Sequence, residues 1–383
     1  MRVVVDGLPL LGEASIATYL RELLLALAAA GEHEYRLFFR GFRSETRRRI
    51  SRLLADPAFA RFPVQITRIP DRLLEWCWTR RSLHLPFTEA WLGRPDLFLS
   101  TIYVTPVVRG IPVVMIAYDL IPLRFPQFYG QDQPLLIPRV RRGIERAEAI
   151  IAISECTKRD YVDLLGADPT RIQVVYPGVD RRFGPPMDVA ARDAVLKRYG
   201  VRQPYLLYVG SLGPHKNVGT LVRVFRRLKR VRRIPHQLVL CGRAAWGREV
   251  VDAARDLVAV GECVVVDFIP SFDVPHLYHG AEAFVFLSLY EGFGLPPLEA
   301  MASGIPVVVS NAGSLPEVVG NAGVQVPPTD EPAIEEAIYR VVTDAGFRKD
   351  LSARGLRQAA RFTWPETARQ TLKVFAAARG ARG

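Results

Sequence analysis

Short apolar runs rich in valine, isoleucine and leucine alternate with longer amphipathic stretches along most of the chain. In the first half, runs that predict strands lie at 2–6, 35–40, 64–69, 96–100, 112–118, 149–154 and 172–176. An amphipathic stretch at 19–31 ends on Gly31, a residue type that commonly terminates helices. Near-continuous apolar runs are typical of strands buried on both faces of a parallel sheet. The pattern therefore predicts an α/β fold.

The alternation stops between residues 177 and 204 and then starts again. This segment is rich in turn-forming residues and is the best linker candidate: Pro177, Gly184, Pro185, Pro186 and Pro204. Further strand candidates follow at 205–210, 237–242, 263–268, 283–288, 306–310 and 323–326, and a nearly all-helical pattern begins at residue 331. We therefore expect two doubly wound α/β domains facing each other across a cleft, with ligands at the carboxyl ends of their strands. The domains are predicted at 1–180 and 205–364, with a linker at 181–204.

The composition is that of an ordinary globular protein large enough for two cores. The chain has 383 residues, of which 49% are hydrophobic and 23% charged, and this excludes disorder, collagen and coiled coil as its main character. Lys and Arg exceed Asp and Glu by 51 to 39, and the net charge of +12 favours nucleic acid, anionic lipid or a phosphorylated substrate as partner. The four cysteines form no C-x-x-C pair, so we expect reduced thiols and a cytosolic protein.

The apolar segments are too short for a signal peptide or a membrane span. The first apolar run stops at Asp6, which favours a core strand. The run LLLALAAA at 23–30 is far shorter than the ~20 residues that a spanning helix needs. We expect a protein that at most attaches to a membrane surface.

The segment EGFGLPPLEAMASGIPVVVSNAGSLPEVVG at 291–320 carries the pattern with the most chemical content. Glu291 follows a predicted strand, and Glu299 lies seven intervening residues later in a predicted helix. Glycines between them expose backbone amides, which together with a helix amino end favour an anion. Two carboxylates placed in this way can accept hydrogen bonds from sugar hydroxyls on either side of a diphosphate. The spacing alone also fits a plain strand–turn–helix connection.

The sequence of this segment resembles the signature motif of retaining GT-B glycosyltransferases, specifically glycosyltransferase family 4. The resemblance extends to DGLPLLGEASIATYLREL at 6–23, to residues 153–180 and to YVGSLGPHKNVGTLV at 208–222, and so covers nearly the whole chain. It implies the GT-B fold, in which two Rossmann-like domains face across a cleft. The first domain would bind the acceptor and the second the nucleotide sugar. A C-terminal helix at 365–383 would cross back onto the first domain.

The resemblance assigns donor-binding roles to the E-x7-E segment. Glu299 would accept hydrogen bonds from the ribose of the donor, and Glu291 would hold hydroxyls of the transferred sugar. The backbone amides of Phe293, Gly294 and Leu295 would cover the sugar and the distal phosphate.

Lys216 would sit on the diphosphate, where a fixed cation lowers the barrier to its departure. A solvated lysine at a helix start is the alternative. Gly210 and Ser211 stand where the family often has Gly-Arg, so Ser211 could supply a hydroxyl and an amide. Arg243 is a candidate substitute cation, and an exposed loop arginine is the alternative for it.

Three residues of the first half match family positions. Gly12 matches the loop under the diphosphate, although a simple loop glycine explains it as well. Tyr118 stands where the family usually has a histidine near the reacting carbon, so it can donate a hydrogen bond but carries no charge near neutral pH. Asp119 is the candidate to orient or deprotonate the acceptor hydroxyl, and capping or a salt bridge is its alternative role.

The remaining motifs bear on which cofactors and binding partners the protein uses. No D-x-D triplet and no His/Cys cluster occurs, so we expect no metal and no cofactor besides the donor substrate. The basic run at 223–233 offers only Phe225 for stacking and predicts a solvated helix face rather than a nucleic-acid site. The segment LLEWCWTRRSLHLPF at 73–87 combines Trp and Arg as interfacial helices do, while core packing with a basic rim is the alternative.

The resemblance implies a retaining hexosyltransferase of polysaccharide or lipopolysaccharide synthesis, and the absence of metal-binding motifs adds that it is metal-independent. Its partners would be a nucleotide-diphosphate sugar, with GDP-mannose as the first guess, a glycan or lipid-linked acceptor and an anionic membrane surface, but not nucleic acid. It would act in the cytoplasm, at the inner face of the plasma membrane. A glucosyl or rhamnosyl donor, a nucleotide-sugar epimerase, a non-catalytic basic binding protein and an inactive scaffold of the same fold remain alternatives.

Overall fold

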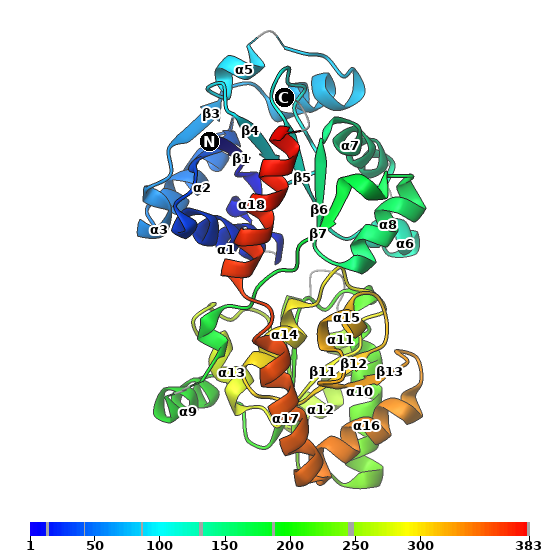
Figure 1. Cartoon of the computed structure of the whole chain (residues 1–383). Coiled ribbons are helices and arrows are strands. Elements are labelled where there is room, and N and C mark those ends of the chain that lie inside the picture. Colours follow the sequence, from blue (N-terminus) through cyan, green and yellow to red (C-terminus); the bar gives the residue numbers. More distant parts are fainter. Residues whose placement is uncertain are drawn as a thin grey trace. The chain divides into compact units, whose positions relative to one another are not determined.

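The computed structural model divides the chain into two units. Unit 1 comprises Met1–Gly178 and Trp364–Gly383, and unit 2 comprises Val179–Thr363 (Figure 1). The structure describes residues 1–12, 15–41, 43–85, 87–129, 133–185, 188–243 and 249–380.

Unit 1 is built on a parallel sheet of seven strands in the order β3-β2-β1-β4-β5-β6-β7. The strands are β1 (Arg2–Asp6), β2 (Glu34–Arg40), β3 (Val64–Thr67), β4 (Leu97–Ser100), β5 (Val113–Ala117), β6 (Ala149–Ala152) and β7 (Ile172–Val174). The helices are α1 (Ser15–Ala30), α2 (Ser44–Leu54), α3 (Pro57–Ala60), α4 (Asp71–Glu75), α5 (Thr88–Trp91), α6 (Ile121–Arg124), α7 (Gln133–Arg146), α8 (Glu155–Leu165) and α18 (Trp364–Gly380). Short 3-10 helices are η1 (Leu8–Leu11), η3 (Pro126–Phe128) and η5 (Pro169–Arg171), and η2 (Trp76–Arg80) is a short π-helix.

Unit 2 is built on a parallel sheet of six strands in the order β10-β9-β8-β11-β12-β13. The strands are β8 (Tyr205–Val209), β9 (Gln237–Cys241), β10 (Cys263–Val266), β11 (Ala283–Phe286), β12 (Val307–Ser310) and β13 (Val324–Val326). The helices are α9 (Val189–Arg198), α10 (Val218–Arg227), α11 (Glu249–Ala253), α12 (Arg255–Ala259), α13 (Val274–Gly280), α14 (Leu295–Ala302), α15 (Leu315–Val319), α16 (Glu331–Thr343) and α17 (Ala345–Ala359). Short 3-10 helices are η6 (Arg181–Phe183) and η7 (Pro214–Lys216), and η8 (Leu228–Arg232) is a short π-helix that continues α10.

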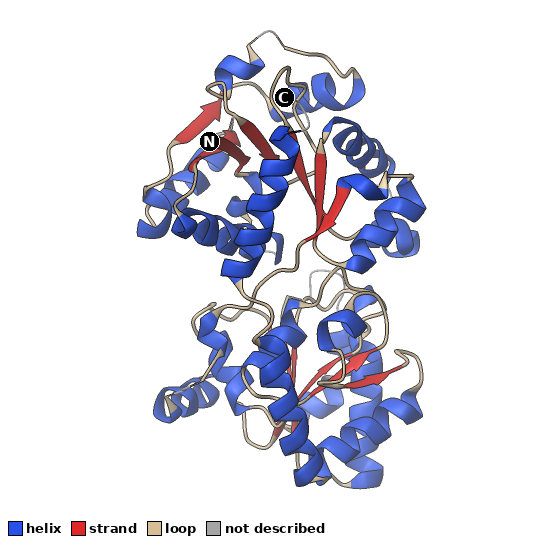
Figure 2. Ribbon diagram, in the orientation of Figure 1, coloured by secondary structure: helices blue, strands red, loops and turns tan. Residues whose placement is uncertain are grey.

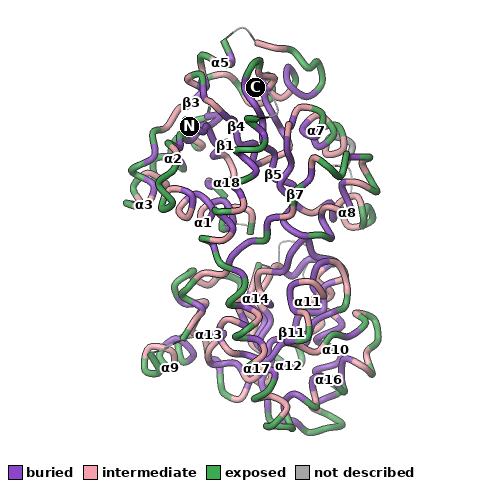
Figure 3. The backbone as a smooth tube through the Cα atoms, viewed as in Figure 1, coloured by how far each residue is buried: buried purple, intermediate pink, exposed green. Residues whose placement is uncertain are grey.

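Both sheets lie between layers of helices, and the predicted pair of doubly wound α/β domains is confirmed (Figure 2). The central strands β4, β5 and β6 are buried along their whole length, as their continuous apolar runs predicted (Figure 3). Strand order reverses between β1 and β4 in unit 1, and between β8 and β11 in unit 2. In sheets of this kind ligands bind at the carboxyl ends of the strands that flank the reversal. These two places are where a site is to be sought.

The segment 181–204, predicted as a linker, contains η6 and α9 and is part of unit 2. Asp188 caps α9 by accepting hydrogen bonds from the amides of Ala190 and Ala191. The hydroxyl of Tyr199 donates to Asp273 at 2.8 Å, at the start of α13. The sequence pattern did not reveal α9, because the Pro and Gly residues on both sides of it indicated a linker.

The basic run at 223–233 forms the outer face of α10 and the turn after it. Leu221, Val222 and Phe225 are buried on the inner face. On the outer face, Arg223 pairs with Glu331, Arg226 with Asp256, and both Arg227 and Arg232 pair with Glu335. Acidic residues of unit 2 therefore offset much of the positive charge of the basic run.

Candidate functional site

Lys216 and Glu291 form an ion pair at the carboxyl ends of the strands that flank the reversal in unit 2. Lys216 ends the turn η7 after β8, and Glu291 follows β11. The ammonium of Lys216 donates to both carboxylate oxygens of Glu291, at 2.7 and 2.9 Å. The side chains are only 16% and 9% exposed, and the ammonium lies 5.5 Å from the centre of the Phe286 ring. Two residues that the sequence analysis assigned to the donor site, 75 positions apart in the chain, therefore lie in contact.

The backbone around Glu291 is fixed by the loop after β12. The hydroxyl of Ser314 donates to the carbonyls of Glu291 and Phe293, at 3.0 and 2.6 Å. Gly313 has a φ of +61°, and a Cβ there would lie 2.7 Å from the amide nitrogen of Glu291. Only glycine permits this close approach. The loop thus holds Glu291 at a defined position without using its side chain.

The helix α14 begins immediately after this turn. Gly294 caps it with a φ of +105°, a conformation that disfavours other residues, and a Cβ there would lie 2.7 Å from Leu315. Phe293 is buried and packs edge-to-face on Phe362, with 5.8 Å between ring centroids. The backbone of 293–295, predicted to cover phosphate, is therefore part of a rigid turn into a helix amino end. Such an end attracts anions.

Glu299 lies one turn into α14 and is partly buried. Burial raises its pKa to about 7, while the hydroxyl of Tyr278, which donates to Oε2 at 2.9 Å, opposes the rise. The charges of Asp180 and Arg182 make smaller contributions of opposite sign. Near neutral pH the carboxyl group therefore exists in both protonation states.

Gly210, Ser211 and Arg243 lie at the ends of β8 and β9, where the backbones almost touch. Gly242 has a φ of +147°, and a Cβ on it would lie 1.8 Å from the carbonyl oxygen of Gly210. The amide of Leu212 donates to the carbonyl of Arg243 at 3.0 Å, which joins the two loops. Sequence reasoning missed Gly242, because only the neighbouring strand shows why a glycine is needed. Arg243 itself lies 5.7 Å from the Phe268 ring centre.

His215, next to Lys216, is buried, and burial together with the charge of Lys216 lowers its pKa to about 4. Its carbonyl accepts a hydrogen bond from the amide of Leu289 at 2.8 Å. The neutral imidazole therefore adds no charge to the site at pH 7, and its backbone ties the lysine loop to the loop after β11.

Gly12, Tyr118 and Asp119 belong to unit 1. Tyr118 and Asp119 directly follow β5. Tyr118 is buried, and burial raises the pKa of its phenol well above the usual value, so the group stays neutral. Within the described residues its hydroxyl has no hydrogen-bond partner. An oxygen of the Asp119 carboxylate accepts from the amide of Ile121 at 3.3 Å. Gly12 ends η1 in an extended conformation that any residue adopts, with its amide bonded to the carbonyl of Pro9.

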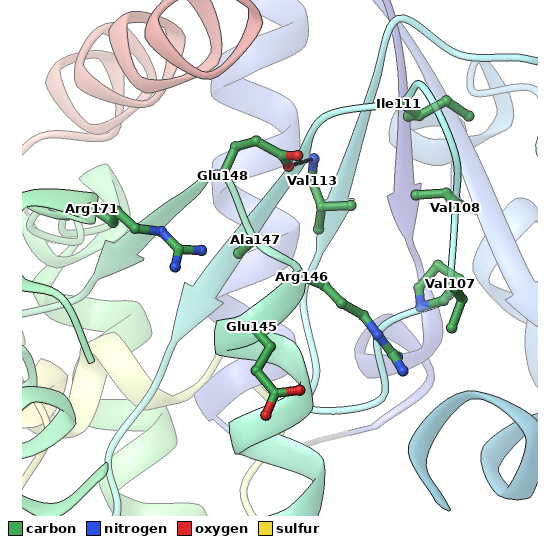
Figure 4. A pocket seen from close by; sticks show the side chains of 10 residues that line it. Val107, Val108, Ile111, Val113, Glu145, Arg146, Ala147, Glu148 and Arg171 are labelled. Carbon is green, nitrogen blue, oxygen red and sulfur yellow. Dashed lines mark hydrogen bonds between the residues drawn. The ribbon is translucent and has the colours of Figure 1, made fainter. Parts of the chain in front are cut away.

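A pocket at the opposite edge of the same sheet was not predicted (Figure 4). It lies by the starts of β5, β6 and β7 and is lined by Val107, Ile111, Arg146, Glu148 and Arg171, among others. Two of its charged side chains already form hydrogen bonds within the protein. Glu148 accepts from the amide of Val113 at 2.5 Å, and Arg171 donates to the carbonyl of Ile144 at 2.8 Å. Ligands of doubly wound sheets bind at the other edge, so this pocket is a weaker candidate.

The segment 73–87 divides between core and surface. Trp78 is buried, whereas Leu73, Trp76, Leu83 and Phe87 are between 42% and 61% exposed. Arg81 lies 5.3 Å from the ring centre of Trp76. Among the described helices, none has the length and apolar character needed to cross a membrane. Within the same described part, no three His, Cys, Asp or Glu side chains are grouped as metal ligands.

Family models match most of the chain. The model described as "Glycosyltransferase Family 4" matches residues 16–183, and the one described as "Glycosyl transferases group 1" matches residues 197–358. A curated relative, O-antigen chain mannosyltransferase B of Escherichia coli, is 31% identical over 260 residues, which are 67% of this chain and 68% of the relative.

Solved structures share the whole architecture. A sucrose-phosphate synthase from Thermosynechococcus elongatus superposes with a TM-score of 0.75 at 21% identity and covers 99% of both chains. HepE of Anabaena, solved in complex with UDP-glucose, gives a TM-score of 0.75 at 18% identity, covering 98% of this chain and 99% of its own. These likenesses confirm the predicted GT-B fold class.

Proposed function

Because the chain belongs to glycosyltransferase family 4, we propose that it is a retaining hexosyltransferase that uses a nucleotide-diphosphate sugar without a metal ion. The observation that carries the proposal is the contact between Lys216 and Glu291 where strand order reverses in unit 2. A cation for a leaving diphosphate and a carboxylate for sugar hydroxyls are the two groups that this chemistry needs at one place.

The donor would occupy the carboxyl edge of unit 2. Glu299 would accept hydrogen bonds from the ribose, and Glu291 would bind hydroxyls of the transferred sugar. Lys216 and the backbone amides of 293–295 would bind the diphosphate, with Gly210, Ser211 and Arg243 beside it. When the donor enters, Lys216 would exchange part of its bond with Glu291 for a phosphate oxygen, and the carboxylate would be released to the sugar.

The transfer step is proposed as a front-side attack. The acceptor oxygen forms a bond to the anomeric carbon while the bond from that carbon to the phosphate oxygen breaks. The acceptor proton passes to the leaving phosphate, so no protein nucleophile is required and the anomeric configuration is retained. Lys216 stabilises the charge that develops on the diphosphate. Tyr118 would contact the donor sugar as a neutral hydrogen-bond donor, and Asp119 would orient the acceptor hydroxyl.

We propose GDP-mannose as donor and a glycan or lipid-linked acceptor of polysaccharide or lipopolysaccharide synthesis. The curated relative reported above is named a mannosyltransferase of the O-antigen chain, and this supports the choice of sugar. The Anabaena structure holds UDP-glucose, so uridine nucleotides belong in the same test.

We also propose attachment to the anionic inner face of the plasma membrane through the exposed side chains of 73–87. Exposed aromatic and apolar residues beside arginines suit the interface of such a membrane. Co-sedimentation with anionic liposomes at low salt tests this, and a failure to co-sediment removes the attachment.

Calorimetry with GDP, UDP and their sugar derivatives tests the donor proposal. We expect one nucleotide to bind clearly more tightly than the others and Glu299→Ala to weaken it about tenfold or more, as loss of hydrogen bonds to a charged group does. Glu317→Ala, in the next helix of the same unit, is the control and should bind as wild type. Equal binding by Glu299→Ala and wild type would show that the ribose assignment is wrong.

A further inference from the structure

Buried aromatic rings of unit 2 form a continuous row of contacts. Neighbouring ring centroids lie 5.3 to 5.8 Å apart along the series Phe183, Tyr278, Phe284, Phe286 and Tyr208. The last four of these residues are each 1% exposed or less, and Phe183, in η6, is also buried. Close-packed ring pairs of this kind hold one another in place, so each ring of the row has a fixed position.

Tyr278 connects this row to the carboxyl group that is proposed to bind the ribose. Its hydroxyl donates to Oε2 of Glu299 at 2.9 Å. Burial raises the pKa of the Tyr278 phenol well above its usual value, so the hydroxyl stays protonated and remains a donor. An ionised carboxylate has about four acceptor positions. One hydroxyl therefore fixes the orientation of the Glu299 carboxylate, which is only partly buried, and leaves acceptor positions for a ligand.

Tyr208 connects the other end of the row to the loop that is proposed to lie beside the diphosphate. Its hydroxyl donates to the carbonyl of Ser211 at 2.7 Å. A Cβ on Gly210 would lie only 2.9 Å from the same hydroxyl, so the loop passes close to it. The neighbouring ring of Phe286 lies 5.5 Å from the ammonium of Lys216, within the range of a cation–π contact. This end of the row therefore contacts both the loop and the cation of the proposed diphosphate site.

The two hydroxyls serve different parts of the proposed donor site. Both tyrosines are buried, so they act on a ligand through Glu299 and through the loop at Ser211. A group that is held in its binding orientation before the ligand arrives loses less conformational freedom on binding. We propose that Tyr278 and Tyr208 are positioning residues, Tyr278 for recognition of the ribose and Tyr208 for recognition of the diphosphate, an inference that rests on the proposed donor site.

Affinities of the full chain for GDP, 2′-deoxy-GDP and GMP, measured by calorimetry, test this division, with UDP, 2′-deoxy-UDP and UMP as a parallel series. Wild type should bind the ribonucleotide about tenfold more tightly than the deoxynucleotide, because a hydrogen bond to a charged group is lost. Tyr278→Phe keeps the ring and removes the hydroxyl. It should reduce this ratio to about threefold or less and leave the ratio of diphosphate to monophosphate affinity unchanged.

Tyr208→Phe should have the opposite effect, lowering the ratio of diphosphate to monophosphate affinity several-fold while the preference for ribose is kept. Tyr339→Phe, which removes the hydroxyl of a tyrosine of α16 outside the row, is the matched control and should leave both ratios unchanged. Ratios distinguish a positioning role from a structural one, because a loosened fold weakens the binding of all three ligands together.

Two results would overturn the inference while leaving the proposed function intact. One is a wild-type preference for ribose in Tyr278→Phe, and the other is an equal reduction of both ratios in both variants. Failure of wild type to bind any nucleotide of either series would instead overturn the proposed function.

Discussion

At the scale of single residues, the site of unit 2 depends on how burial changes ordinary side chains. Lys216 and Glu291 are each nearly buried and satisfy one another, so the pair is stable without ligand. Removing one member leaves the other charge buried and unpaired, which costs far more than loss of an exposed pair. The motif around each residue could be identified from sequence, but their contact follows from two loops that only the sheet brings together.

Lys216→Ala should lower turnover at saturating donor by about 10²- to 10³-fold, the usual effect of removing one group that stabilises transition-state charge. Steady-state assays of sugar transfer measure this. Lys349→Ala, an exposed lysine of α17, is the control. If Lys216→Ala turned over as fast as wild type, the proposed role of this lysine in the reaction would be wrong.

The raised pKa of Glu299 makes the free energy of unfolding depend on pH. The unfolded carboxyl titrates near its ordinary value of 4.5 and the folded one near 7, so the folded state holds the extra proton between these values. Its contribution to stability is therefore present at low pH and lost as pH rises through 7. We expect Glu299→Gln to gain stability relative to wild type between pH 5 and pH 8 in urea titrations.

A constant difference between Glu299→Gln and wild type over this range would show that the folded pKa is not raised. Glu317→Gln, in α15 of the same unit, serves as the control variant and should track wild type throughout. His215, with a lowered pKa of about 4, is present in all three proteins and so cancels from the comparison.

At the scale of elements, the ends of β8 and β9 approach so closely that side chains are excluded. Gly210 and Gly242 both have φ values near +150°, and the carbonyl of one occupies the place of a Cβ on the other. The strands themselves follow from their apolar runs. The close approach does not, because it depends on the register by which Val209 pairs with Cys241.

Gly242→Ala should destabilise unit 2 by several kcal/mol, because the new Cβ would lie 1.8 Å from a backbone oxygen at a φ of +147°. Thermal unfolding with far-ultraviolet circular dichroism measures the loss. Gly219→Ala, in α10, would place a Cβ 3.6 Å from the flexible side chain of Arg223, an ordinary contact, and should by contrast be neutral or raise stability by about 0.5–1 kcal/mol. Equal stability of Gly242→Ala and wild type would contradict the observed loop geometry.

At the scale of the whole molecule, the chain returns to unit 1 after completing unit 2. The helix α18 packs along α1 and against β5 and β6 (Figure 1). Its Trp364 lies edge-to-face on Tyr19, at 5.7 Å between ring centroids, and Phe375 is fully buried. The core of unit 1 therefore depends on residues from both ends of the sequence.

Phe375→Ala should destabilise unit 1 by about 3–5 kcal/mol, the usual cost of emptying a buried phenylalanine site. Hydrogen exchange read by mass spectrometry should show faster exchange in 1–178 and unchanged exchange in 179–363. Phe225→Ala, which empties an equally buried site in unit 2, should show the reverse. Acceleration spread evenly over both units by either variant would mean that the units do not unfold separately.

The sequence by itself determined the fold class, the number of units and most strands, because hydrophobic periodicity and turn-forming residues are local signals. It also showed that the candidate site residues follow the ends of predicted strands. It also located the E-x7-E segment and Lys216, since the residues around each of them resemble motifs of the family. Tertiary structure alone decided the contact of Lys216 with Glu291 and the need for glycine at position 242. Each of these depends on which strands lie side by side, and a linear pattern does not contain that information.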